Sequence, residues 1–95
     1  MRVLIIEDDS MVAMIHKEYF NRKEVDFTVD HASSLKEAEL YLKSNIPDLV
    51  VLDNYLSDGK GVSFLSKLKK YPVVMITAAN DIQTVEAALS SGVVD

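Results

Sequence analysis

The stretch VLIIEDDS, residues 3–10, joins four apolar residues directly to three acidic ones. A short apolar run bounded by polar residues is typical of a strand that is buried on both faces. Two later runs have the same form: Leu49–Leu52 ends at Asp53, and Val73–Ile76 ends at Thr77. The sequence therefore predicts three interior strands, two of which end in carboxylates.

Helical patterns separate these strands. Ser10 to about Phe20 has apolar positions at helical spacing, with Asp9 as a cap of its first turn. Ser34 and Glu37 form a capping box that begins a second helix. The inner faces that this spacing predicts for three helices consist of Val12, Ile15 and Tyr19; of Leu35, Ala38 and Leu42; and of Val62, Leu65 and Leu68.

The second strand has a different pattern, because Val25, Phe27 and Val29 alternate with polar residues. Alternation is typical of a half-buried edge strand. Strands alternating with helices predict a doubly wound α/β fold with a parallel sheet, flavodoxin-like, in the strand order 2-1-3-4. The fourth strand has an interior pattern, so we expect residues 1–95 to be one domain that lacks its fifth strand and fifth helix.

Composition narrows the function. The chain has 95 residues, no cysteine and a formal net charge of −5, which excludes disulfides and thiolate metal sites and disfavours direct nucleic-acid contact. There is no apolar run of membrane-spanning length and no signal-peptide pattern, so we expect a cytoplasmic protein without membrane contact.

The carboxyl ends of the first and third strands meet where the strand order reverses, which is where open α/β sheets bind ligands. Glu7, Asp8 and Asp53 should converge there, and a hard cation such as Mg²⁺ would relieve their repulsion. Asp53 could accept a phosphoryl group, and Thr77 could donate to it, with the Ala78 backbone N–H exposed nearby. Taken singly, the acids could instead stabilise a helix N-terminus, and Thr77 could be a simple strand-end hydroxyl.

Other residues suggest no site. We expect both His16 and His31 at the surface, and the lysines Lys67, Lys69 and Lys70 on a solvated helix face. The methionines Met11, Met14 and Met75 are interpreted as core filler.

Four segments together resemble the receiver (CheY-like) domain of two-component response regulators: VLIIEDD, PDLVVLDNYLSDGKG, PVVMITAAND and ALSSGVVD. The resemblance implies that Asp53 is phosphorylated by a sensor histidine kinase. It implies Mg²⁺ ligation by Asp8 directly, by Glu7 through water, by Asp53 and by the Tyr55 backbone carbonyl. Thr77 would be the switch hydroxyl, and Ala78 would give its N–H to the phosphoryl group.

The chain departs from the family pattern at Ser57, where proline is usual, and it ends before the family's lysine and aromatic switch residue. We therefore expect a truncated receiver domain, with self-association through the exposed edge of Val73–Ile76. A likeness to regulators paired with citrate- and dicarboxylate-sensing kinases implies a DNA-binding output domain elsewhere in the parent protein.

Two other functions remain. A Mg²⁺-dependent phosphohydrolase often has a second aspartate two residues after the nucleophile, and that position is Tyr55 here. A degenerate receiver that only binds partners would lack Asp53 or the acidic pair, and this chain has all three. We expect no enzymatic turnover beyond self-dephosphorylation.

Overall fold

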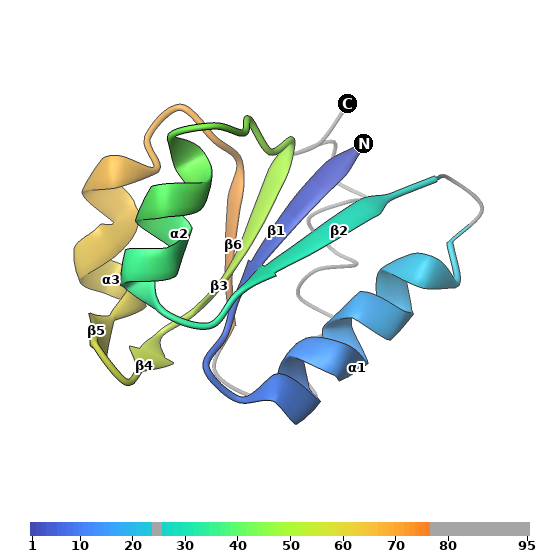
Figure 1. The fold of residues 1–95 in the computed structure, drawn as a ribbon, viewed down its shortest axis with the longest axis horizontal. Coiled ribbons are helices and arrows are strands. Elements are labelled where there is room, and N and C mark those ends of the chain that lie inside the picture. The colour runs from blue at the N-terminus through green and yellow to red at the C-terminus, as the bar shows by residue number, and fades with distance from the viewer. Residues whose placement is uncertain (24–25, 77–95) are drawn as a thin grey trace.

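A four-stranded parallel sheet forms the centre of the molecule, with α1 on one face and α2 and α3 on the other (Figure 1). The structure is a computed structural model, which describes residues 1–23 and 26–76. Its elements are β1 (Arg2–Ile6), α1 (Ser10–Asn21), β2 (Thr28–Ala32), α2 (Leu35–Leu42), β3 (Leu49–Asp53), β4 (Tyr55–Leu56), β5 (Gly59–Lys60), α3 (Gly61–Phe64), the 3₁₀ helix η1 (Leu65–Lys67) and β6 (Val73–Ile76).

The strand order is β2-β1-β3-β6, which confirms the predicted order 2-1-3-4. Every residue of Val3–Ile6 and Leu49–Leu52 is completely buried, because helices cover both faces of β1 and β3. β2 lies at the edge, as predicted, but spans Thr28–Ala32 and pairs with β1 from Arg2↔Thr28 to Ile6↔Ala32. The predicted strand began too early: Phe27 precedes β2, and Val25 lies outside the described residues.

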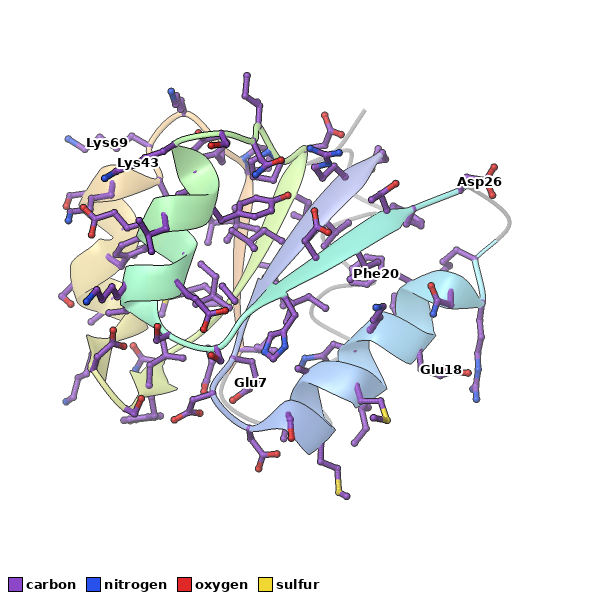
Figure 2. All side chains as sticks on the ribbon, in the orientation of Figure 1. Glu7, Glu18, Phe20, Asp26, Lys43 and Lys69 are labelled. Atoms are coloured by element: carbon purple, nitrogen blue, oxygen red, sulfur yellow. The ribbon has the colours of Figure 1, made fainter. Side chains whose placement is uncertain are left out.

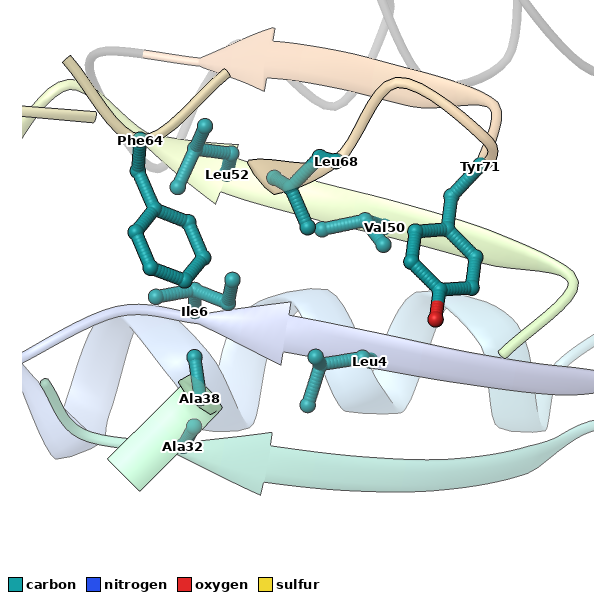
Figure 3. Close-up of a cluster of buried hydrophobic side chains, with 9 residues drawn as sticks. All are labelled: Leu4, Ile6, Ala32, Ala38, Val50, Leu52, Phe64, Leu68 and Tyr71. Atoms are coloured by element: carbon teal, nitrogen blue, oxygen red, sulfur yellow. The ribbon is translucent and has the colours of Figure 1, made fainter. Parts of the chain in front are cut away.

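Two apolar clusters lie on the two faces of the sheet. The cluster under α2 and α3 is drawn in Figure 3 and consists of Leu4, Ile6, Ala32, Ala38, Val50, Leu52, Phe64, Leu68 and Tyr71. The cluster under α1 consists of Val3, Ile5, Ala13, Phe20, Leu49, Val51, Val74 and Ile76. Each fully buried aliphatic side chain contributes about 1.5–3 kcal/mol as an upper estimate, so these clusters dominate stability.

The buried face of α1 is shifted by one position along the sequence from the predicted one. Ala13, His16 and Phe20 are buried, whereas Ile15 is 47% exposed. The sets 12, 15, 19 and 13, 16, 20 have the same helical spacing, so periodicity alone could not choose between them. His16 is therefore buried rather than at the surface, and Met11 and Met14 are exposed rather than core filler.

The third helical segment is shorter than predicted. α3 ends at Phe64 and continues as the 3₁₀ helix η1, so the residue spacing of a regular α-helix does not hold. Val62 is 54% exposed and Phe64 is buried, against the predicted inner face, whereas Leu68 is buried and Leu65 is partly buried, as predicted. The α2 prediction is confirmed, with Ala38 buried and Leu35 and Leu42 packed beside it.

Side-chain caps fix where the helices begin. The Asp9 carboxylate accepts hydrogen bonds from Met11 N and Val12 N at the start of α1. The Ser34 hydroxyl accepts from Glu37 N, as the capping box predicts, while the Glu37 carboxylate accepts from the Ser33 hydroxyl. The bonds to Asp9 and Ser34 satisfy N–H groups that have no partner within a helix.

A second cap of α2 comes from a distant loop. β4 and β5 form a short hairpin, and Asp58 lies at its turn. The Asp58 carboxylate accepts from Leu35 N and Lys36 N, both at 3.0 Å. These two backbone N–H groups hold the pKa of Asp58 below its usual 3.8. Asp58 thus fastens the loop that follows β3 to the N-terminus of α2.

Within the described ranges 1–23 and 26–76, no helix has the length and apolar character required to cross a membrane.

We predict that Asp58→Asn lowers the free energy of unfolding at pH 7. A lowered folded-state pKa stabilises the protein above pH 3.8, and this contribution is lost as pH falls through the lower folded value. The difference between wild type and variant should therefore narrow below pH 3.8. Urea denaturation at a series of pH values measures it, with the exposed Asp26→Asn as control. If the difference in free energy of unfolding between wild type and Asp58→Asn stays constant until Asp58 is fully protonated, the prediction is wrong.

Candidate functional site

Three carboxylates meet at the carboxyl ends of β1 and β3. Glu7 and Asp8 directly follow β1, and Asp53 is the last residue of β3. β1 and β3 pair from Val3↔Leu49 to Ile6↔Leu52, so the next residue pair brings Glu7 beside Asp53. Figure 2 shows Glu7 at the base of the sheet, beside the start of α1. Each of the three residues offers an oxygen, and these oxygens lie within 4.8 Å of one another.

The position coincides with the reversal of strand order. The chain passes from β1 to the neighbouring β2 on one side and then returns to β3 on the other. From the carboxyl ends of the adjacent strands β1 and β3 the chain runs in opposite directions, to β2 and to β6 respectively, and open α/β sheets bind ligands at such a point. The predicted convergence of these acids is thus what the pairing of the strands produces.

Burial makes this cluster electrostatically unfavourable without a cation. Glu7 is 5% exposed and Asp53 is 6% exposed, whereas Asp8 is exposed. The pKa of Glu7 is raised to about 8: burial is the largest cause, the backbone N–H of Asp9 opposes it, and the charge of Asp53 adds to it. Glu7 therefore keeps a proton at neutral pH unless positive charge replaces it.

These carboxylates fit a hard divalent cation. Mg²⁺ prefers oxygen ligands and commonly binds through one or two carboxylates while keeping several waters. One exposed and two buried carboxylates provide oxygens for such an ion and leave a side open to water. In the described part of the chain, no histidine nitrogen lies among the possible ligand atoms of this cluster.

Backbone and side-chain bonds hold the loop after Asp53 in place. Asp53 Oδ1 accepts from Tyr55 N at 3.3 Å, and Asn54 O accepts from Gly61 N at 2.8 Å. Asn54 Oδ1 accepts from Val62 N, which fastens the start of α3 below the site. A Cβ atom at Gly61 would lie 2.3 Å from the Asp53 carbonyl oxygen, so this position requires glycine.

The other predicted site residues are placed as follows. Tyr55 begins β4 next to the site, and its side chain is 60% exposed. Thr77 and Ala78 directly follow β6 in the sequence but lie outside the described residues.

Sequence reasoning did not find one residue beside the site. His31 is exposed, as predicted, but its Nε2 also lies 2.6 Å from the backbone oxygen of Glu7. The only sequence signal was its place near the end of the strand that neighbours β1.

Comparison with known proteins adds independent evidence. The family model described as the response regulator receiver domain matches residues 3–95. The chain is 38% identical over 97 residues to the transcriptional regulatory protein DpiA of Escherichia coli (strain K12), covering 98% of this chain and 43% of DpiA. It is 34% identical to the probable C4-dicarboxylate response regulator DctR of Priestia megaterium, covering 98% of this chain and 42% of DctR. The chain thus spans less than half the length of these relatives.

Among solved structures, the chain is similar to the MaeR response regulator bound to beryllium trifluoride. The TM-score is 0.73 and the sequence identity is 37%, covering 99% of this chain and 80% of the MaeR chain.

We predict that Gly61→Ala lowers the free energy of unfolding by about 1–3 kcal/mol, because the new methyl group must displace the Asp53 backbone. Urea denaturation measures the loss. Val62→Ala, at the next and 54% exposed position, is the matched control and should change stability by no more than about 0.5 kcal/mol. Equal effects of the two substitutions would show that the close approach at Gly61 is unimportant.

We also predict that Asp53→Asn lowers the pKa of Glu7 in the metal-free protein. The value should fall from about 8 because a neighbouring negative charge is removed, yet remain above 4.5 because burial is its largest cause. An NMR titration of the Glu7 side-chain carboxyl carbon measures it. The control is Glu18→Gln, a change of an exposed acid of α1, which should leave the pKa of Glu7 unchanged. If the pKa of Glu7 in Asp53→Asn equals that of the wild type, the effect ascribed to the Asp53 charge is wrong.

Proposed function

This chain belongs to the family of response regulator receiver domains, and from that membership we propose that it is a Mg²⁺-dependent phosphoacceptor in which Asp53 receives the phosphoryl group. The observation that carries this proposal is the cluster formed by Glu7, Asp8 and Asp53, whose oxygens lie within 4.8 Å of one another. The donor is a sensor histidine kinase of the same two-component system.

The chemistry requires a carboxylate that can act as a nucleophile. A lone pair on an Asp53 carboxylate oxygen attacks the phosphorus atom of a phosphohistidine, and an O–P bond forms while the P–N bond breaks. The imidazole leaves with the electron pair of the broken bond and takes up a proton from water. The product is an acyl phosphate on Asp53, which water later hydrolyses.

Four groups of this chain would hold the cation: the carboxylates of Glu7, Asp8 and Asp53, and the Tyr55 backbone carbonyl. When bound, Mg²⁺ supplies positive charge that neutralises the oxygens of the transferred phosphoryl group. Asp8 would be a direct ligand, and Glu7, which is the more deeply buried of the pair, would act through water. The Thr77 hydroxyl and the Ala78 N–H donate to phosphoryl oxygens, so that Thr77 reports phosphorylation to the rest of the domain.

The parent protein controls transcription through an output domain that this chain does not contain. Support comes from the relatives, of which one is a transcriptional regulatory protein and another a probable C4-dicarboxylate response regulator. The receiver domain itself makes no nucleic-acid contact, in keeping with its net charge of −5. It acts in the cytoplasm, where the kinase domain and the genes are accessible.

A phosphohydrolase that acts on external substrates is the second candidate. Tyr55 occupies the position where many such enzymes have a second catalytic aspartate, which favours a phosphoacceptor. Steady turnover of simple phosphoesters would indicate the hydrolase, whereas one phosphoryl group per chain indicates the receiver.

We predict that Asp53→Asn abolishes phosphorylation by a small acyl phosphate donor in the presence of Mg²⁺, because an amide cannot form the acyl phosphate. Intact-protein mass spectrometry measures the added phosphoryl group. Asp26→Asn, an exposed aspartate far from the site (Figure 2), is the matched control and should be labelled like the wild type. Removal of Mg²⁺ by a chelator should suppress wild-type labelling. Labelling of Asp53→Asn at the wild-type level would refute the assignment.

A further inference from the structure

His31 makes a specific contact with the backbone of the acidic pair. Its side chain extends from β2, and its Nε2 lies 2.6 Å from the Glu7 carbonyl oxygen. A carbonyl oxygen can only accept a hydrogen bond, so Nε2 must carry the proton and donate. The bond joins residues that are 24 positions apart in the sequence.

This bond takes the place of a further backbone hydrogen bond between β1 and β2. The pairing of β1 with β2 ends at Ile6↔Ala32, and the last backbone bond runs from Glu7 N to Ala32 O at 3.0 Å. The chain then leaves the sheet, because Ser34 caps α2. The His31 side chain supplies a donor where β2 has no further backbone N–H to offer, so Glu7 is held through both its N–H and its C=O.

The Glu7 carbonyl belongs to the same planar peptide group as the N–H of Asp8. Fixing this plane restricts the direction in which the Asp8 side chain leaves the backbone. Asp8 is the exposed member of the carboxylate cluster, so packing does not hold its side chain as it holds those of Glu7 and Asp53. The orientation of the peptide plane is therefore especially important for Asp8.

We propose that His31 is a positioning residue for cation binding, because its Nε2–H holds the Glu7–Asp8 peptide so that the Asp8 carboxylate faces Glu7 and Asp53. The inference rests on the proposed function, since it assumes that these carboxylates bind Mg²⁺. It adds a residue that touches neither the cation nor the phosphoryl group and acts only through the backbone of two ligands.

The test is a Mg²⁺ titration of the full chain, followed by the amide NMR signals of Asp8 and Asp53. His31→Ala should weaken Mg²⁺ binding about tenfold, the lower range for loss of a group that orients metal ligands. His31→Gln retains a side-chain N–H donor and should recover most of the affinity. Thr28→Ala is the matched control, because Thr28 is exposed on the same strand at the end away from the site.

A metal-free measurement separates positioning from general stability. The free energy of unfolding in the presence of a chelator should differ little between His31→Ala and Thr28→Ala, because both side chains are exposed. In the wild type, the imidazole ¹⁵N shifts should show that Nε2 carries the proton. A neutral ring protonated at Nδ1 alone would overturn the proposal.

The possible failures can be told apart. Wild-type protein that does not bind Mg²⁺ would overturn the proposed function, and this inference with it. Wild-type protein that binds while His31→Ala binds equally well would overturn the role of His31 alone. Weaker binding that His31→Gln does not restore, together with a matching loss of stability without metal, would assign His31 a purely structural role.

Discussion

Two neighbouring buried strands place carboxylates closer together than their charges favour. Burial of β1 and β3 fixes the register of their pairing, because a shift would expose apolar side chains or bury polar ones. That register brings Glu7 beside Asp53 in surroundings with little water. The energy that opposes this arrangement is far smaller than that gained by the two apolar clusters, so the core can maintain a cluster in which Glu7 stays protonated until a cation replaces the proton.

The loops around the site are joined to the rest of the domain by polar bonds. Asp9 caps α1, Asn54 joins the end of β3 to the start of α3, and Asp58 joins the hairpin to α2. Each bond links a loop to a helix terminus, where backbone N–H groups have no partner within the helix. The sheet thus supports loops that directional hydrogen bonds connect to the helix termini. This combination positions oxygens accurately at a surface that remains accessible.

Much of the fold and of the acidic cluster could be predicted from the sequence, because continuous apolar runs reveal strands buried on both faces. Strand order and the meeting of Glu7, Asp8 and Asp53 follow from that pattern. Helix faces were less predictable, since α1 has two sets of positions with the same spacing and the structure buries His16 rather than Ile15. The β4–β5 hairpin and the contacts of Asp58 and His31 depend on segments far apart in the sequence, for which periodicity gives no signal.

The contacts of the hairpin turn also constrain how related sequences can vary. Surface loops usually accept insertions at low cost, because closure entropy rises slowly with length. Here Asp58 must reach Leu35 N and Lys36 N while Gly61 remains against the Asp53 backbone. The segment from Asp58 to Gly61 is therefore fixed at both of its ends. An inserted or deleted residue between them would release one end. The number of residues from Asp53 to Gly61 is therefore constrained, and a relative with a different number must cap α2 in another way.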